Sequence, residues 1–245
     1  MNYIKSIFLN KKPPPSSYLC DLPVVRHLMD GGELRFDAPV TFLVGENGTG
    51  KSTLIEAIAV AYGFNPEGGS RNFNFSTNES HSMLWQCLTL SKTLPAKDGF
   101  FLRAESVYNL ATNIDELDPS IIAGYGGVSL HAQSHGESFL SIVQHRFHGN
   151  GLYILDEPEA ALSPQRLMTL LVEIDRLVKD KSQLIIATHS PMLMAYPHAA
   201  ILQLSDNGIS RVNYKDTEHY KVTKMFLDCP EKMLNLLLES EEMTL

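Results

Sequence analysis

A glycine-rich segment between an apolar run and a helical pattern constrains this chain more than any other feature. Residues 45–52 read Gly-Glu-Asn-Gly-Thr-Gly-Lys-Ser. The preceding run, residues 39–44, is short, apolar and rich in β-branched side chains, which is typical of a buried parallel strand. Residues 51–62 carry apolar side chains at helical spacing. A strand, a glycine turn and a helix in immediate succession indicate an α/β fold.

The residue types of this segment suit a loop that holds phosphate groups. Glycines let backbone N–H groups turn inward on an anion, and the positive end of the following helix points at the same place. We expect Lys51 to reach the β- and γ-phosphates of ATP and the Ser52 hydroxyl to ligate Mg²⁺. The candidate nucleotide-binding residues of the segment are Gly45, Glu46, Asn47, Gly48, Thr49, Gly50, Lys51, Ser52 and Thr53.

Two carboxylates, Asp156 and Glu157, directly follow the apolar run 152–155. At the end of a buried strand, Asp156 would hold Mg²⁺ through its water shell. Glu157 is one residue further along, so it points differently and can face the attacking water. Two acids at a strand end are also common on solvated surfaces, but the glycine-rich loop upstream favours the functional interpretation.

A histidine follows a third apolar run, residues 183–188. The carboxyl ends of parallel strands deliver the residues that contact ligands in folds of this kind. At such an end, His189 can donate a hydrogen bond to a γ-phosphate and also touch the catalytic glutamate. The predicted catalytic residues are therefore Glu157 and His189, and no role is predicted for the other histidines.

The rest of the pattern alternates strands and helices, which predicts a largely parallel central sheet flanked by helices. Further strands are expected at 3–9, 83–90 and 100–103, and a hairpin is expected to join 200–204 to 209–214 across the turn 206–208. Further helices are expected at 106–117, 137–147, 164–181, 216–227 and 231–239. Irregular structure is expected at 63–78 and 121–133.

Length and composition indicate one ordinary globular domain, residues 1–245. The 245 residues have a net charge of -8, which does not support nucleic-acid binding through charge alone. The 3 cysteines are far apart and odd in number, as in a reduced cytoplasmic protein. No signal peptide is visible, and no run approaches about 18 uninterrupted apolar residues, so no membrane segment is expected.

The order of these motifs resembles the ABC ATPase superfamily, and the segment Ser134-His135-Gly136-Glu137 strengthens that resemblance. It precedes a helix at the place where ABC proteins carry their Leu-Ser-Gly-Gly-Gln signature, of which Ser134 and Gly136 remain. The resemblance implies that Ser134 and Gly136 bind the γ-phosphate held by the opposite subunit of an ATP-dependent homodimer. The same residues also fit an ordinary capped helix with Ser134 at the N-cap and Glu137 completing a capping box.

Over residues 20–240 the chain resembles small stand-alone bacterial ATPases of the AAA/ABC type. These are similar to the ATPase heads of chromosome-maintenance and DNA-repair ABC proteins. The resemblance implies a P-loop NTPase fold with an additional antiparallel β portion and a helical signature subdomain at about 105–150. It also implies a Mg²⁺-dependent cytoplasmic ATPase that works as a switch or motor on a protein partner, in DNA maintenance or phage defence.

Three departures from the family pattern matter. The glutamine that usually lies near the metal corresponds by position to Glu105, or less well to Gln86, so Glu105 is a candidate metal residue with Ser52 and Asp156. The aspartate that usually ends the loop after the acidic pair is replaced by Ser163. No aromatic residue is clearly placed to stack on adenine, with Tyr18 and Phe36 as weak candidates.

Two other functions fit parts of the pattern. The ATP-binding subunit of an ABC transporter is the alternative to a switch ATPase, but such subunits more often carry the full signature. A small-molecule kinase built on a phosphate loop would need neither Ser134 and Gly136 nor His189.

Overall fold

The fold is built on a six-stranded central sheet in the computed structural model, which describes residues 2–71, 82–116 and 122–239. The strand order is β5-β6-β7-β3-β8-β9, and all neighbours are parallel except β8 and β9. The strands are β3 (Val40–Val44), β5 (Asp98–Arg103), β6 (Gly151–Asp156), β7 (Gln183–Ala187), β8 (Ala200–Ser205) and β9 (Gly208–Val212). The predicted largely parallel α/β sheet is confirmed.

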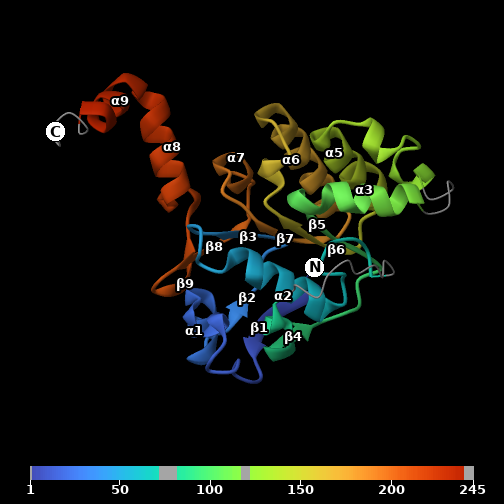
Figure 1. Ribbon diagram of the computed structural model, residues 1–245, viewed down its shortest axis with the longest axis horizontal. Coiled ribbons are helices and arrows are strands. Elements are labelled where there is room, and N and C mark those ends of the chain that lie inside the picture. Colours follow the sequence, from blue (N-terminus) through green and yellow to red (C-terminus); the bar gives the residue numbers. More distant parts are fainter. Residues whose placement is uncertain (1, 72–81, 117–121, 240–245) are drawn as a thin grey trace.

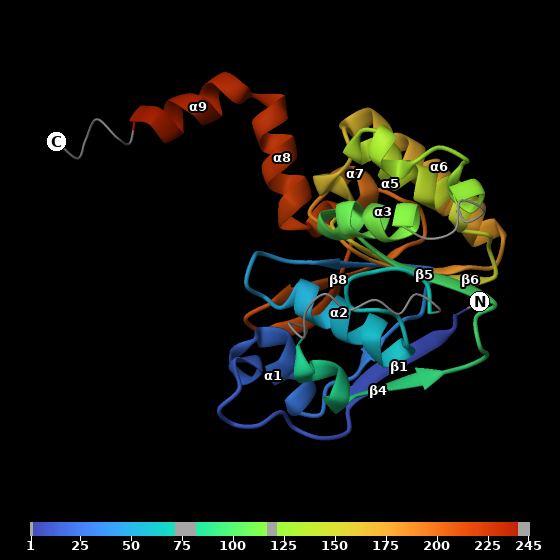
Figure 2. The same cartoon turned by 45° about the vertical axis from the view of Figure 1, so that its right-hand side comes forward.

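Helices cover both faces of this sheet (Figures 1 and 2). On one face lie α1 (Pro23–Met29) and α2 (Lys51–Tyr62), and on the other lie α3 (Val107–Glu116), α5 (His135–Arg146), α6 (Pro164–Lys179) and α7 (Pro191–Met194). Every residue of β3, β6 and β7 is buried, because the strands are covered on both sides. Each face of the sheet packs into its own apolar cluster.

A second, antiparallel sheet lies beside α1 and α2 (Figure 2). Its order is β2-β1-β4, with β1 (Ile4–Leu9), β2 (Leu34–Arg35) and β4 (Leu88–Lys92). The predicted antiparallel β portion is therefore confirmed. Its inward-facing side chains, such as Ile4, Ile7 and Leu34, join the same apolar cluster as α2.

The structure differs from the sequence-based expectation around residue 83. Residues Met83–Cys87 form a 3-10 helix, and only then does β4 begin. The Ser82 hydroxyl accepts a hydrogen bond from the Leu84 N–H at 3.1 Å and thereby caps this helical turn. The short helices α1 and α7 were not predicted, although each begins with a proline in its first turn.

Other predicted elements appear with small shifts at their ends. The hairpin is confirmed: β8 and β9 pair up to Ser205 and Gly208 around a two-residue connection. Parts of three predicted elements lie outside the described residues: 72–78 of the predicted loop, residue 117 of a helix and residue 121 of the irregular segment. The predicted signature subdomain at 105–150 contains α3 and α5, which pack together, and its separate status stays a prediction.

The C-terminal helices α8 (Glu218–Asp228) and α9 (Pro230–Glu239) project away from the body of the molecule as an arm (Figures 1 and 2). No side chain of α8 is buried. Among the described residues, no helix has both the length and the apolar character needed to cross a membrane.

Candidate functional site

The strand order brings three predicted motifs to one edge of the central sheet. Strand β7 lies between β3 and β6, with Leu43 paired to Ala187 and Ala187 paired to Asp156. The glycine-rich loop, the acidic pair and the Thr188–His189 segment therefore leave the sheet side by side, at the carboxyl ends where α/β folds place ligands.

The glycine-rich loop needs glycine at both of its ends. Gly45 has a φ of +151°, and a Cβ there would lie 2.3 Å from the Leu204 carbonyl oxygen on β8. Gly50 is in the left-handed region and is the N-cap of α2, whose first residue is Lys51. Within the loop, Thr49 Oγ1 donates to the Glu46 carbonyl at 2.8 Å. The first N–H groups of α2, which a helix leaves without intrahelical partners, therefore lie at the end of this loop.

Lys51 is buried, and its ammonium group spans this loop. Its Nζ donates to the carbonyl oxygens of Gly45 at 2.7 Å and Glu46 at 3.0 Å. Burial lowers the pKa of Lys51, while the carboxylates of Glu157 and Asp156 act in the opposite direction. The positive charge therefore lies between the loop and the two acids.

Ser52 and Asp156 meet across the site, with Ser52 Oγ 3.5 Å from Asp156 Oδ1. Asp156 is only 5% exposed. Burial raises its pKa to about 7, although the Arg103 guanidinium opposes that shift. A hydroxyl and a carboxylate are hard oxygen ligands of the kind that bind Mg²⁺ together with water and phosphate oxygens. The residues present fit that ion.

Arg103 was missed by the sequence analysis and is central to this group of charges. The pairing of β5 with β6 sets it opposite Asp156, and its Nε lies 3.5 Å from Asp156 Oδ2. The same guanidinium pairs with Glu56 at 2.9 Å and Glu105 at 2.5 Å. The available sequence signal was its position at the end of a predicted strand, two residues before Glu105.

Glu105 is 71% exposed at its side chain and reaches Asp156 through Arg103. Its assignment as a metal residue stays a prediction. Gln86, the weaker alternative, is exposed on the 3-10 helix that precedes β4, in the other sheet. Thr53 is half-buried one residue beyond Ser52 on α2.

Glu157 has a left-handed backbone, with φ of 48° and ψ of 53°. This conformation is strained for a residue other than glycine and is often found at functional sites. Its N–H donates to the Ala187 carbonyl at 3.0 Å, which holds the turn against β7. The side chain faces a cavity of about 560 Å³ that is also lined by Glu46, Asn47 and His189.

His189 faces the same cavity, with its Nε2 3.7 Å from Glu157 Oε1. Nε2 is buried and has no hydrogen-bond partner among the described residues. Burial lowers the pKa of His189, and the Lys51 charge adds to that effect. These effects favour the neutral ring, and one of its nitrogens is directed at the predicted reaction site.

Glu159, which sequence reasoning also missed, holds the start of the loop after β7. Its carboxylate accepts the Thr188 hydroxyl at 2.8 Å and the His189 backbone N–H. It therefore fixes the backbone on which the His189 ring is mounted. His219 of α8 contacts the ring itself, with its Nε2 2.9 Å from His189 Nδ1.

Ser134 and Gly136 lie at the amino end of α5. Ser134 is the N-cap, and Glu137 Oε2 accepts from its N–H at 2.9 Å and its hydroxyl at 2.6 Å. The capped-helix interpretation is thus confirmed, whereas the γ-phosphate site stays a prediction. Arg166 of α6 donates to Ser134 Oγ at 3.2 Å and to Glu137 at 2.9 Å.

Gly136 is required by close packing at this helix end. A Cβ at residue 136 would lie 2.6 Å from Arg166 Nη1 and 2.8 Å from the Ala161 carbonyl oxygen. Within the described part of the chain, no hydrogen bond joins Ser134 or Gly136 to the glycine-rich loop. Ser163 is the N-cap of α6, and its hydroxyl accepts from the Arg166 N–H.

A cavity of about 440 Å³ is lined in part by the glycine-rich loop, residues 45–49. Its lining includes Arg26 of α1, Gln203 of β8 and His219 of α8, together with Asp21 and Asp206. Neither weak candidate for adenine stacking lines it. Tyr18 is 60% exposed, and Phe36 is buried against the antiparallel sheet.

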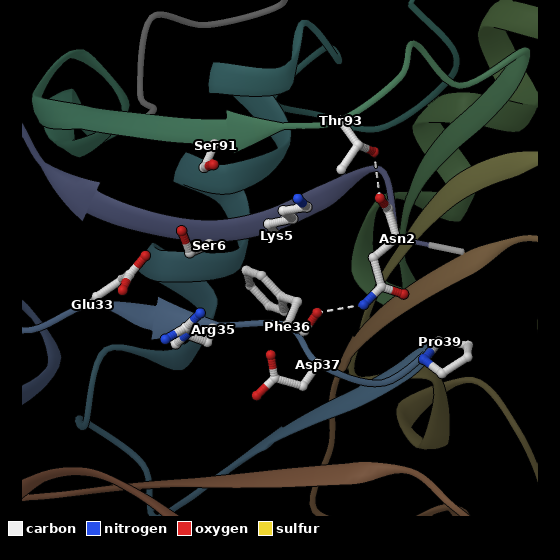
Figure 3. Close-up of a pocket in the computed structure, with 10 residues that line it drawn as sticks. All are labelled: Asn2, Lys5, Ser6, Glu33, Arg35, Phe36, Asp37, Pro39, Ser91 and Thr93. Atoms are coloured by element: carbon white, nitrogen blue, oxygen red, sulfur yellow. Dashed lines mark hydrogen bonds between the residues drawn. The ribbon is translucent and has the colours of Figure 1, made fainter.

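Another cavity, of about 790 Å³, lies against the antiparallel sheet (Figure 3). Phe36, Lys5 and Arg35 are among its lining residues. The Thr93 hydroxyl donates to the Asn2 carbonyl at 2.5 Å, and the Asn2 amide donates to the Phe36 carbonyl. Its lining shares no residue with the glycine-rich loop or the acidic pair, so this cavity is separate from the candidate site.

Two AAA-domain models match the chain. One matches residues 25–91, and the other, described as a putative AbiEii toxin of a type IV toxin–antitoxin system, matches residues 127–195. No curated protein matches the chain. With the glycine-rich loop between β3 and α2, the two matches indicate a P-loop ATPase domain of the AAA type.

Several solved structures are similar to the chain at low identity. A putative metal-chelate type ABC transporter is 13% identical over 91% of this chain and 88% of its own, with a TM-score of 0.49. CbiO1 of Clostridium perfringens, part of an ABC transporter complex, is 15% identical over 97% and 100%, with a TM-score of 0.48. The SMC head domain of Thermotoga maritima is 16% identical over 86% and 99%, with a TM-score of 0.44.

Proposed function

We propose that this protein hydrolyses ATP between two copies of itself and acts as a switch or motor on a partner protein. The observation that carries the proposal is the convergence of Lys51, Asp156, Glu157 and His189 at one sheet edge. Each of these side chains has the charge or hydrogen-bonding capacity that one part of phosphoryl transfer to water requires.

Each residue then has a defined task. Lys51 exchanges its two backbone carbonyl partners for the β- and γ-phosphate oxygens of ATP. Ser52 and Asp156 would hold Mg²⁺, which when bound neutralises charge on the β- and γ-phosphates. Glu157 orients the attacking water, because it lines the cavity next to His189 and the glycine-rich loop. His189 donates from Nε2 to the terminal phosphate.

The second anion site is proposed for Ser134 and Gly136 of the opposite copy. A serine hydroxyl and the first N–H groups of α5 offer donors to a phosphate. Arg166, 3.2 Å from Ser134 Oγ, adds a positive charge beside them. In the single chain the Ser134 N–H, the Ser134 hydroxyl and Arg166 are bonded to the Glu137 carboxylate, so a terminal phosphate from another copy would have to compete with Glu137.

The choice of a switch over a transporter subunit rests on the incomplete signature, in which His135 and Glu137 replace glycine and glutamine. We infer that the partner is a protein effector. The net charge of -8 does not favour DNA as the direct ligand. The toxin–antitoxin description of the model matching 127–195 supports including growth inhibition among the assays of the effector.

The Glu157→Gln variant tests the proposal, because it separates binding from chemistry. The amide keeps the shape of the side chain but cannot act as a carboxylate toward water. We expect hydrolysis to fall by about 10²-fold or more, while ATP binding is retained. The variant should be a monomer without nucleotide and a dimer with ATP and Mg²⁺ by sedimentation. Wild-type hydrolysis by this variant would overturn the proposal.

A further inference from the structure

We propose that His219 is a positioning residue that sets the tautomer of His189, so that His189 presents an N–H to the terminal phosphate. The inference rests on the ATPase function proposed above and deepens it. His219 is the second residue of α8, 30 positions beyond His189, and belongs to no motif in the sequence.

The contact between the two rings is direct. His189 Nδ1 and His219 Nε2 are 2.9 Å apart, and the ring centroids are 5.1 Å apart with planes inclined at 57°. Both residues line the cavity that also receives Glu157. Glu159 anchors the backbone of His189, while His219 contacts the ring nitrogen on the side opposite Nε2.

Two neutral imidazoles at this distance share one proton between their facing nitrogens. If His189 Nδ1 carried it, Nε2 would present a lone pair to Glu157 Oε1, 3.7 Å away, and to any phosphate in the cavity. In that arrangement the Nε2 lone pair, the Glu157 carboxylate and the phosphate oxygens would all be acceptors, and no donor would lie among them. If His219 Nε2 carries the proton and donates it to His189 Nδ1, then His189 Nε2 bears the hydrogen and faces acceptors. The surrounding carboxylate therefore selects the second arrangement.

The surroundings of the pair favour two neutral rings, as this arrangement requires. Burial lowers the pKa of each histidine, and the Lys51 ammonium acts in the same direction. The opposing carboxylates are Glu157 beside His189, and Glu218 and Glu159 near His219. A neutral His189 that carries its proton on Nε2 can donate to a phosphate without adding a positive charge beside Lys51.

The tautomer can be read directly by NMR of nucleotide-free protein labelled with [¹⁵N]histidine. The His189 signals are assigned by their loss in His189→Gln. We expect wild-type His189 to be protonated at Nε2 and unprotonated at Nδ1. His219→Leu should give a mixture of both tautomers. In His219→Gln the amide nitrogen reaches the same place and donates to Nδ1, so the wild-type tautomer should be retained.

Kinetics provide the second measurement. His219→Leu should lower kcat by about 10-fold, the scale of one lost hydrogen bond, with KM for ATP nearly unchanged. His219→Gln should restore most of the rate. Lys221→Ala, an exposed residue of the same helix, is the matched control and should behave as wild type in both measurements.

Two results would overturn the inference. One is a wild-type His189 protonated at Nδ1, and the other is a His219→Leu protein with unchanged tautomer and kcat. The NMR measurement needs no nucleotide and no turnover. It therefore separates this inference from the ATPase proposal, which fails on its own if Glu157→Gln hydrolyses ATP at the wild-type rate.

Discussion

At the scale of single residues, Asp156 lies in an environment that is unfavourable for a negative charge. It is buried among Glu56, Glu105 and Glu157, with Arg103 as the opposing cation. Its pKa of about 7 lies above the ordinary value of 3.8, so the folded protein binds more protons than the unfolded chain between these two values. Stability should therefore fall as the pH rises from about 4 to 7.

Replacing Asp156 by Asn should remove this loss of stability at higher pH. In Mg²⁺-free and nucleotide-free solution, we expect Asp156→Asn to be more stable than wild type at pH 8. The upper limit of the gain is about 4 kcal/mol, at about 1.4 kcal/mol for each pKa unit. Urea unfolding at pH 4 and pH 8 measures it. Equal slopes of stability against pH in both proteins would show that Asp156 titrates normally.

Lys51→Ala should abolish ATP binding. The substitution removes the buried ammonium group that spans the glycine-rich loop, and no other residue of that loop carries a positive charge. Titration with a fluorescent ATP analogue measures the effect, and circular dichroism checks that the variant is folded. Unchanged affinity would place the nucleotide elsewhere on the molecule.

Glu105→Gln tests the predicted role near the metal. Loss of its charge frees Arg103 from one of its carboxylate partners and removes one negative charge acting on Asp156. We expect the Mg²⁺ concentration for half-maximal ATPase activity to shift, with hydrolysis retained. A Mg²⁺ titration identical to wild type would make Glu105 an ordinary surface partner of Arg103.

At the scale of elements, the amino end of α5 is the part of the molecule on which the dimer proposal depends. Its donors gather around Ser134, and the tight packing of Gly136 against Arg166 and Ala161 holds this helix end on α6. A signature of this kind is therefore a packing feature of two helices as well as a candidate ligand site.

In a Glu157→Gln background, Ser134→Arg should eliminate the ATP-dependent dimer while leaving ATP bound, because a bulky cation fills the second anion site. Light scattering with ATP and Mg²⁺ measures the dimer, and equilibrium dialysis measures bound ATP. Gln144→Arg, on the exposed side of the same helix, is the matched control and should still dimerise. An equal dimer dissociation constant in both variants would contradict the head-to-tail arrangement.

At the scale of the whole molecule, the candidate site and the C-terminal arm meet at the base of α8, where His219 contacts His189. The arm projects from the body (Figure 1). Leu227, Leu236 and Leu238 are among its exposed apolar side chains. None of the side chains described on α9 contributes to the two apolar clusters of the body.

Removal of residues 230–245 should therefore leave the body intact. We expect a thermal midpoint within a few degrees of the full chain and an unchanged basal ATPase rate, since α8 and His219 remain. Calorimetry and a phosphate-release assay measure the two quantities. A large loss of stability would mean that α9 packs on the body in solution.

The local parts of the site were predictable from the sequence. The glycine-rich loop is contiguous, and a buried strand before it and a helix after it are each visible as a short periodic pattern. The positions of Asp156, Glu157 and His189 could be predicted, because the two acids come at the end of one apolar run and His189 follows another, and each run had to be a buried strand. These features depend on residues that are adjacent in the chain, and the sequence gives that adjacency directly.

The tertiary structure alone decided which distant side chains meet. Arg103 reaches Asp156 because β5 pairs with β6, Glu159 binds the backbone of His189, and His219 reaches its ring because α8 returns to the sheet edge after the β8–β9 hairpin. Strand order and helix docking depend on packing summed over the whole core. A periodic pattern indicates only which side of a helix or strand is apolar. It does not indicate which other helix or strand packs on that side.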